Sequence, residues 1–461
     1  MNIILFSIDT LRADRLSCYG HSRLTSPHID RLAAQSALFT KYFSPHIPTF
    51  PGHTTLMTGR DVYAHQISGQ SHARELDPSI PMLAEMLQQA GYYTAAADNL
   101  GRWFARGMDD IQGYSWDTAD AAGWRKGEAV LQAALSVLHR AASQDKPFFL
   151  FIHFWDPHTP YLPPAPFSRM FYEGDEKDPA NRSMDPVWSF ENFKWYFNEW
   201  MPGVTDIEFP KAQYDAEIAY ADACLAHVLT RIEELGLADD TLLALTSDHG
   251  EELDEHGCWF DHHGLYDPNT HIPLILRLPG RIPAGTRIPG FATHLDLTPT
   301  ILDYAGLLDG QRRFDGVSLR PLIDRRPGGI SRGVRDIVHM TENTWMKKRA
   351  VRTHEWKLIV ALEPDMHGFP PVELYHLSED PAEQRNVSAE YPEIVRDLRS
   401  RMEEHVRART ASEGVADPLP SQPIPLRRIG RVEERLGVEL AAAGDEKIAH
   451  GDFVGYERGD A

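Results

Sequence analysis

Short apolar runs and amphipathic stretches alternate along the chain as far as residue 248. The apolar runs have the length of β-strands, whereas the amphipathic stretches repeat their apolar residues at helical spacing. In chain order, the strand 2–8 precedes the helix 26–39, and helix-then-strand pairs follow at 79–92 and 93–98, 127–144 and 147–154, and 219–236 and 241–248. This alternation predicts an α/β fold whose large, mainly parallel sheet is flanked by helices on both faces.

Polar side chains lie at the ends of three of these predicted strands. In open α/β sheets ligands bind beyond the carboxyl ends of the strands, so polar residues at this edge are candidates for a functional site. They are Asp9 after the first strand, His153, Asp156 and His158 around the end of the third, and Asp248 and His249 at the end of the fourth. The predicted sheet therefore brings carboxylates and imidazoles to one edge.

The pattern changes twice along the chain. Residues 161–210, rich in proline, aromatic residues and aspartate, show no clear periodicity, which is typical of a lid or a pocket wall inserted into a catalytic domain that spans 1–335. From residue 336 to 410 we expect a small C-terminal α+β domain with an antiparallel sheet and a helix. The proline-rich, charged segment 411–461 predicts an extended arm, through which the protein could form a homo-oligomer.

Composition and charge exclude several classes of protein. The 461 residues include 67 acidic and 46 basic ones, and the formal charge of −21 would repel the phosphate backbone of a nucleic acid. The three cysteines, Cys18, Cys224 and Cys258, are too few and too widely spaced for a disulfide framework or a zinc finger. Because we find no signal peptide and no apolar run of about 20 residues, we expect a cytoplasmic protein without a membrane partner.

Asp9, Asp248 and His249 are candidate metal ligands. Carboxylate oxygens and imidazole nitrogens bind divalent cations such as Mn²⁺, Zn²⁺ or Ca²⁺, and three ligands leave coordination positions open for a substrate. Taken singly, each residue has a structural alternative, because an aspartate can cap a turn and a histidine can be hydrogen-bonded in the core. Three such residues at the ends of two strands of one sheet favour the metal site.

Thr49 lies in the unusual stretch "HIPTFPGHTTLMTGR", residues 46–60. Pro48 and Pro51 restrict the backbone around its hydroxyl, and the residues that follow can open a helix whose N-terminus favours an anion. A metal ion beside this oxygen would lower its pKa and make Thr49, as a further metal ligand, a nucleophile. The alternative is that Thr49 only caps the helix.

Six blocks of the sequence together resemble a known family. In order along the chain they look like the successive motifs of the sulfatases in the alkaline phosphatase superfamily. The blocks are "FSIDTLRADRLSCYG", "TFPGHTTLMTGR", "FIHFWDPHTPY", "TSDHGEELDEHG", "HLDLTPTILDYAGL" and "ELYHLSEDPAEQRNV". The resemblance runs from residue 1 to about 410 and implies an alkaline phosphatase-like fold with a small C-terminal domain.

The motif around Thr49 departs from the sulfatase pattern. Sulfatases have a cysteine there, matured to formylglycine, within C-x-P-x-R; here Thr49 and His53 stand at the cysteine and arginine positions, so formylglycine cannot form. The motif formed by residues 49–53 instead resembles that of the phosphodiesterases of the superfamily, whose nucleophile is threonine. The second aspartate of the N-terminal metal pair falls on Thr10, and the pair Asp248 and His249 resembles that of phosphonate monoester hydrolases.

Neighbouring motifs imply roles for four more positions. Arg102 matches a lysine that contacts the nucleophile and the anion, and Phe104 replaces a histidine of the same motif. Either His262 or His263 stands where a second lysine would lie. His158 matches the histidine that contacts the ester oxygen. From sequence alone, Arg102 could equally be a surface ion pair, and His262 or His263 a structural residue.

These observations predict a metal-dependent hydrolase that acts on a small anionic ester. Thr49 attacks phosphorus or sulfur, Arg102 and His53 neutralise the equatorial oxygens, and His158 or His262 protonates the leaving group. The expected substrates are phosphodiesters or phosphonate monoesters, whose second substituent the aromatic stretch 188–200 could hold. A second metal could use residues from the set Asp156, His158, His262 and His263.

Three alternatives remain open at this point. The protein could be a sulfatase that works without formylglycine, or a catalytically silent family member that binds an anion. It could also be a transferase that passes the group on Thr49 to an alcohol, although such relatives are usually membrane-anchored. Buried carboxylates beside a histidine are costly without a cation, which disfavours the silent protein.

Overall fold

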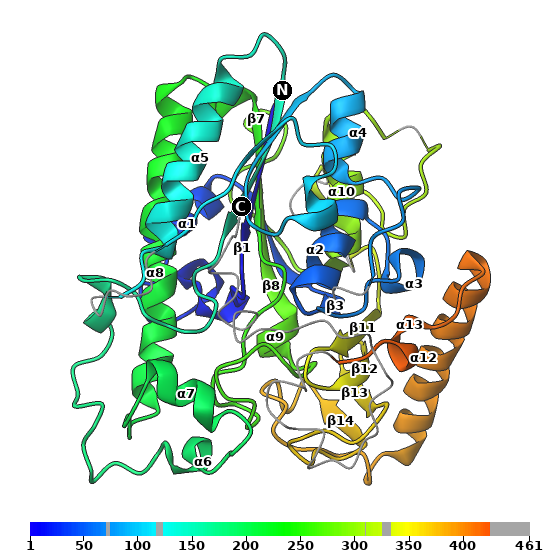
Figure 1. Cartoon of the computed structure of the whole chain (residues 1–461). Helices are drawn as coiled ribbons and strands as arrows, with labels where there is room; N and C mark the ends of the chain where they lie inside the picture. Colours follow the sequence, from blue (N-terminus) through cyan, green and yellow to red (C-terminus); the bar gives the residue numbers. More distant parts are fainter. Residues whose placement is uncertain (71–73, 117–122, 309, 325–332, 425–461) are drawn as a thin grey trace.

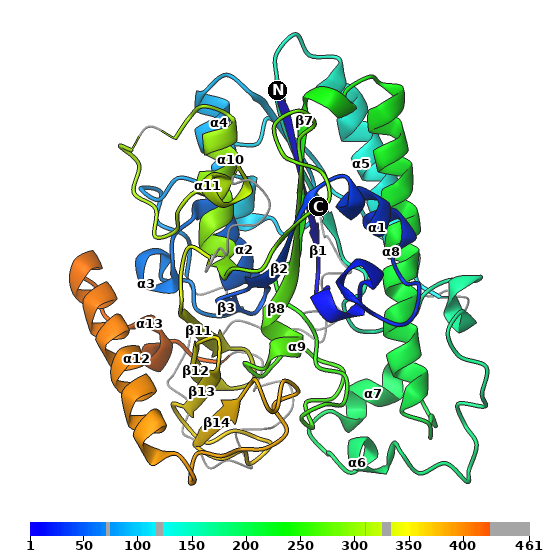
Figure 2. The same cartoon turned by 180° about the vertical axis from the view of Figure 1, so that it is seen from behind.

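The computed structural model describes residues 1–70, 74–116, 123–308, 310–324 and 333–424. A large sheet runs through the middle of the molecule, with helices on both of its faces (Figure 1). A second, smaller sheet lies beyond the end of the large sheet at which β1 ends, and the long helix α12 packs beside it (Figures 1 and 2). The predicted α/β architecture with a small C-terminal antiparallel sheet is confirmed.

The large sheet has nine strands in the order β10-β2-β8-β7-β1-β6-β4-β5, with β9 paired to β2. Every pair in it is parallel except the two made by β8. The strands are β1 (Asn2–Ile8), β2 (Ala37–Phe43), β4 (Tyr93–Ala97), β5 (Asp110–Gln112), β6 (Phe148–Phe154), β7 (Thr241–Thr246), β8 (His271–Arg277), β9 (Thr286–Ile288) and β10 (Ala292–Thr293). The central position of β1, between β6 and β7, places Asp9 between the ends of those two strands.

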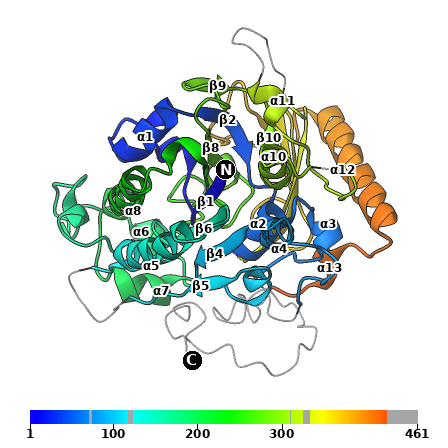
Figure 3. The same cartoon turned by 90° about the horizontal axis from the view of Figure 1, so that it is seen from above.

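The alternating side chains of β1 divide the core into two layers. Ile4, Phe6 and Ile8 belong to one buried cluster, whereas Ile3 and Leu5 belong to another on the opposite face of the sheet. The first cluster is covered by α1 (Pro27–Ala34), α5 (Lys126–Ala142) and α8 (Glu208–Glu234), and the second by α2 (Thr49–Thr58), α4 (Leu83–Gln89) and α10 (Leu297–Tyr304) (Figure 3). Burial on both faces explains why the strand sequences are apolar almost throughout.

The small sheet is built on a strand from the N-terminal part of the chain. Its order is β14-β13-β12-β11-β3, antiparallel except for the pair of β3 and β11. The elements are β3 (His46–Ile47), β11 (Val338–Asn343), β12 (Lys347–Arg352), β13 (Trp356–Ala361), β14 (Val372–His376) and the helix α12 (Pro392–Glu413). Because β3 ends two residues before Thr49, the C-terminal sheet directly supports the start of α2. The side chain of His46 strengthens this junction, with Nδ1 2.8 Å from Thr341 Oγ1.

The segment 161–210 carries short helices and a buried aromatic cluster. Phe193, Tyr196 and Phe197 are buried in the same core layer as Tyr161 and Phe260. The remaining short α-helices of the described chain are α3 (Val62–His65), α6 (Asp185–Trp188), α7 (Lys194–Trp200), α9 (Asp267–Thr270), α11 (Arg320–Ile323) and α13 (Pro418–Ser421). These aromatic side chains pack as core although most of the segment is exposed or half-buried, and the use of stretch 188–200 to hold a substituent stays a prediction.

The predicted C-terminal arm is only partly described. α12 continues through residue 413, and Gln422 then bonds to Ser68 and to the carbonyl oxygen of Gln66. Residues 425–461, most of the expected arm, lie outside the described residues. None of the helices in the described ranges combines the length and the apolar character needed to cross a bilayer.

Candidate metal and nucleophile site

Asp9, Asp248 and His249 meet at the carboxyl edge of the large sheet. Asp9 follows β1 and the other two follow β7, and these strands are parallel neighbours. One ligand atom from each of the three lies within 4.8 Å of the others, and all three side chains are fully buried. The geometry therefore brings together the candidate ligands that the sequence indicated.

The carboxylates in this group have buried oxygens without hydrogen bonds. Neither carboxyl oxygen of Asp9 has a hydrogen-bond partner, so Asp9 does not cap the turn that follows it. Asp248 Oδ1 accepts the backbone N–H groups of His249 (2.9 Å) and Thr10 (3.3 Å), but Oδ2 makes no hydrogen bond. Buried carboxylate oxygens without donors are costly, and a cation between them would remove that cost. The donor set fits a divalent metal ion.

Thr49 is the first residue of α2 rather than its cap. The cap position is Pro48, and the Thr49 hydroxyl lies 3.2 Å from His249 Nε2 instead of bonding a backbone N–H. His249 Nδ1 lies 2.9 Å from the Gly250 carbonyl oxygen and must donate to it, which leaves the lone pair of Nε2 facing Thr49. The alternative of a helix-capping threonine is therefore wrong.

His53 lies beneath Thr49, one turn further along α2. It is fully buried, and its Nε2 lies 2.9 Å from the Ser7 hydroxyl. Its Nδ1 lies 3.2 Å from the Thr49 carbonyl oxygen and 3.5 Å from Asp248 Oδ2. Burial lowers the pKa of His53 and favours the neutral ring. With both nitrogens engaged inside the protein, His53 is placed to position Thr49 and Asp248, not to contact the equatorial oxygens as expected.

His153 connects the candidate metal ligands Asp9, Asp248 and His249 to an aspartate that the sequence analysis did not select. Its Nδ1 lies 3.0 Å from Asp98 Oδ1, and its Nε2 lies 3.3 Å from Asp9 Oδ2. Burial disfavours the charged ring, but the carboxylates of Asp9 and Asp98 outweigh burial and raise the pKa of His153 to about 10. Asp98 follows β4, another parallel strand, and this position was the one signal that could have identified it.

His158 and His262 occupy the partly exposed side of the site. Their ring centroids are 5.0 Å apart, and the His262 ring stacks on His249 at 4.8 Å. Burial alone would lower the pKa of His262, but the carboxylates of Asp261 and Glu251 outweigh it and raise the pKa to about 9. Of the two candidate histidines, His262 faces the site, and its neighbour turns away into a separate cluster.

Arg102 and Asp156 lie near the site but are engaged elsewhere. The Arg102 guanidinium donates to Glu75 Oε1 at 2.6 Å and lies over the ring of Phe50, the residue after Thr49. Asp156 pairs with Lys126 Nζ at 3.4 Å. The expected role of Arg102 at the anion stays a prediction.

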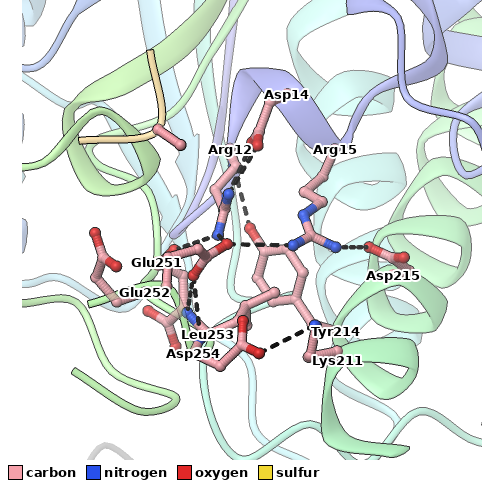
Figure 4. Close-up of polar contacts among 12 residues, drawn as sticks. Arg12, Asp14, Arg15, Lys211, Tyr214, Asp215, Glu251, Glu252, Leu253 and Asp254 are labelled. Carbon is pink, nitrogen blue, oxygen red and sulfur yellow. Dashed lines mark hydrogen bonds and ion pairs between the residues drawn. The ribbon is translucent and has the colours of Figure 1, made fainter. Parts of the chain in front are cut away.

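The loops that carry the metal group are tied together by buried polar contacts. Arg12 donates to the Glu251 carbonyl oxygen (3.1 Å) and to Glu255 Oε1 (2.7 Å), which links the loop after β1 to the loop after β7 (Figure 4). The Tyr214 hydroxyl, from α8, donates to the Thr10 carbonyl oxygen at 2.6 Å. These contacts hold Asp9 and Asp248 in a fixed relation before any ligand binds.

Comparisons with known proteins agree with this geometry. The family model described as Sulfatase matches residues 1–307, and the model described as N-sulphoglucosamine sulphohydrolase, C-terminal, matches residues 254–408. An N-acetylglucosamine-6-O-sulfatase of Bacteroides thetaiotaomicron is 24% identical over 87% of this chain and 86% of that protein. A choline-sulfatase of Rhizobium meliloti is 25% identical over 84% of this chain and 82% of that protein.

A solved structure shows the same fold. The phosphonate monoester hydrolase of Agrobacterium radiobacter superposes with a TM-score of 0.71 at 23% identity, over 89% of this chain and 96% of that chain. Together with the family model that matches most of the sequence, this places the protein among enzymes that hydrolyse esters. The chain belongs to the sulfatase family, within the alkaline phosphatase superfamily.

Proposed function

We propose that this chain hydrolyses phosphodiesters or phosphonate monoesters through a covalent ester on Thr49. The observation that carries the proposal is the Thr49 hydroxyl, which stands at the position of the family's nucleophile and faces His249 Nε2 at 3.2 Å. The three cysteines lie elsewhere in the sequence, so formylglycine is not available at this position.

Asp9, Asp248, His249 and Thr49 would hold a divalent metal ion, for which Mn²⁺, Zn²⁺ and Ca²⁺ are the candidates. Their buried oxygens and the lone pair of His249 Nε2, which faces the Thr49 hydroxyl, match the ligands such an ion prefers. When bound, the ion supplies Lewis-acid stabilisation of negative charge and favours the deprotonated hydroxyl. Among the described residues, His158 and His262 belong to no second group as tight as this one, so we assign one metal to the reaction.

The protein's own residues account for the two halves of the reaction. In its deprotonated form, Thr49 Oγ1 forms a bond to phosphorus while the bond from phosphorus to the leaving oxygen breaks, and a proton from His158 or His262 neutralises that oxygen. Water then attacks the phosphorus of the Thr49 ester, one of its protons passes to the same histidine, and Thr49 leaves again as the deprotonated hydroxyl. His53 keeps Thr49 in place through both halves.

Sulfate esters are the second candidate substrates, and the names of the curated relatives favour them. Formylglycine releases sulfate by collapse of a hemiester, in which a carbon–oxygen bond breaks. A sulfate ester of threonine cannot break down in this way, so water must attack its central atom instead. Phosphoryl groups on this superfamily's nucleophiles leave by that route, which is why we place phosphorus esters first.

A panel of chromogenic esters tests the proposal. Purified enzyme loaded separately with Mn²⁺, Zn²⁺ or Ca²⁺ would be assayed on aryl phosphodiesters, phosphonate monoesters, phosphate monoesters and sulfates with a common leaving group. We expect the highest kcat/KM for a phosphodiester or a phosphonate monoester. Faster turnover of a sulfate than of every phosphorus ester would instead assign a sulfatase that works with an unmodified threonine.

The leaving-group histidine can be identified with His262→Gln. General acid catalysis contributes on the order of 10²–10⁴-fold, and it matters most when the leaving oxygen is basic. We therefore expect a large loss of kcat on alkyl esters and a small loss on nitrophenyl esters. His158→Gln is the matched variant, because His158 lies beside His262. The Nδ1 atom of His158 bonds the Thr159 carbonyl oxygen at 2.7 Å. The reverse pattern between the two variants would assign the proton to His158.

A further inference from the structure

A second cluster of metal-binding side chains lies outside the reaction site. Cys258, His263 and His367 each offer a ligand atom within 4.8 Å of the other two. Cys258 and His263 are fully buried, and His367 is partly exposed in the loop between β13 and β14. The two imidazoles face each other, with Nε2 of His263 2.9 Å from Nε2 of His367.

Three carboxylates near the cluster each have one buried oxygen without a hydrogen-bond donor. These carboxylates, Glu252, Glu342 and Asp365, all lie near enough to Cys258 to act on it electrostatically. Lys348 is close to the same group, and its Nζ lies 3.5 Å from Asp365 Oδ2. His256 Nδ1 likewise lies 2.9 Å from Glu252 Oε2. Two of the three carboxylates therefore have a basic partner, and it is the buried oxygens without donors that favour a bound cation.

We propose that Cys258, His263 and His367 bind a Zn²⁺ ion outside the reaction site. One thiolate and two imidazoles are a ligand set that zinc prefers over the harder Mg²⁺ and Ca²⁺. The three ligand atoms already lie within 4.8 Å of one another, and they leave the fourth tetrahedral position open. In the absence of an ion, one imidazole must donate an N–H to the other, and Zn²⁺ would take the place of that proton.

The proposed ion would join two segments that are far apart in the sequence, and a third segment contacts one of its ligands. Cys258 and His263 come from the loop after β7, and His367 comes from the small C-terminal domain. The His367 ring also stacks on Phe190, from the segment 161–210, at 4.6 Å. Because His263 is adjacent to His262, an ion here would fix the backbone that presents His262 to the reaction site. The site thus positions His262 without touching the substrate.

Cobalt substitution tests the zinc site independently of activity. Full-length Asp248→Asn protein, in which the reaction site is disabled, would be depleted of metal and loaded with Co²⁺. We expect a thiolate-to-cobalt charge-transfer band that is absent from the double variant Asp248→Asn with Cys258→Ser. Cys224→Ser, at another buried cysteine, is the matched control and should keep the band. A folded Asp248→Asn protein without the band would overturn the proposal.

Zinc content supplies a second measurement for variants that fold poorly. His367→Asn changes the partly exposed ligand and leaves the buried core in place. In the Asp248→Asn background we expect it to lose the zinc that dialysed protein retains, and we expect a chelator to lower Tm only when His367 is present. Equal zinc content with and without His367 would show that the cluster is a hydrogen-bonded histidine pair beside a buried thiol.

Discussion

Thr49→Val is expected to lower kcat/KM on the best phosphorus ester by on the order of 10⁴-fold or more. Valine keeps the β-branched shape of the side chain at the start of α2 but removes the oxygen that forms the covalent ester. The lost hydrogen bond to His249 is worth only about 1 kcal/mol of folding free energy, so the variant should remain folded. Steady-state kinetics together with denaturant unfolding separates the two effects.

Thr49→Ser is the matched control, because it retains a hydroxyl on the same backbone. We expect it to keep much of the activity, with loss arising from the freer rotation of the serine side chain. Full activity per folded molecule in Thr49→Val would show that another group or water attacks the substrate directly. In that case the contact between Thr49 and His249 would be structural.

Asp248→Asn is expected to remove metal and activity together. The change takes away one of the negative charges that attract the ion, and we expect a loss of kcat/KM of roughly 10³-fold or more at limiting metal. In chelated protein the same change should cost little stability, because it removes a buried charge that lacks a donor on Oδ2. Metal analysis, kinetics and unfolding of metal-free protein give the three readouts.

Asp254→Asn is the control for this experiment. Asp254 lies on the same loop and pairs with Lys211 Nζ at 3.1 Å at the partly exposed surface (Figure 4). A surface ion pair contributes about 0–1 kcal/mol, so metal content and activity should stay close to those of the unchanged protein. Unchanged metal content and activity in Asp248→Asn would remove that residue from the ligand set.

The fold and the first metal group could be predicted because both depend on local patterns. Strand and helix periods along the chain indicated a parallel sheet, and neighbouring parallel strands necessarily bring Asp9 and Asp248 to one edge. Asp98 ends the predicted strand 93–98, which is the same signal that selected Asp9 and Asp248, but its local sequence does not show what it contacts. Its role depends on His153, a residue 55 positions away, which orients the two carboxylates.

Features that depend on packing could not be obtained from the sequence. The pairing of β3 with β11 joins residues almost 300 positions apart, and no short pattern encodes it. His262 and His263 are adjacent and chemically identical, so only the tertiary structure shows which ring faces the site. Likewise, the position of His53 in the motif suggested a contact with the anion, whereas its burial beneath Thr49 indicates support of the nucleophile.

The stereochemical course at phosphorus is the most direct test of the Thr49 ester. A phosphorothioate diester of known configuration would be hydrolysed in water enriched in heavy oxygen, and the configuration of the labelled product would be determined. Attack by Thr49 followed by attack by water inverts phosphorus twice, so the account predicts net retention. Net inversion would mean that water attacks the substrate in a single displacement, and it would contradict the covalent mechanism.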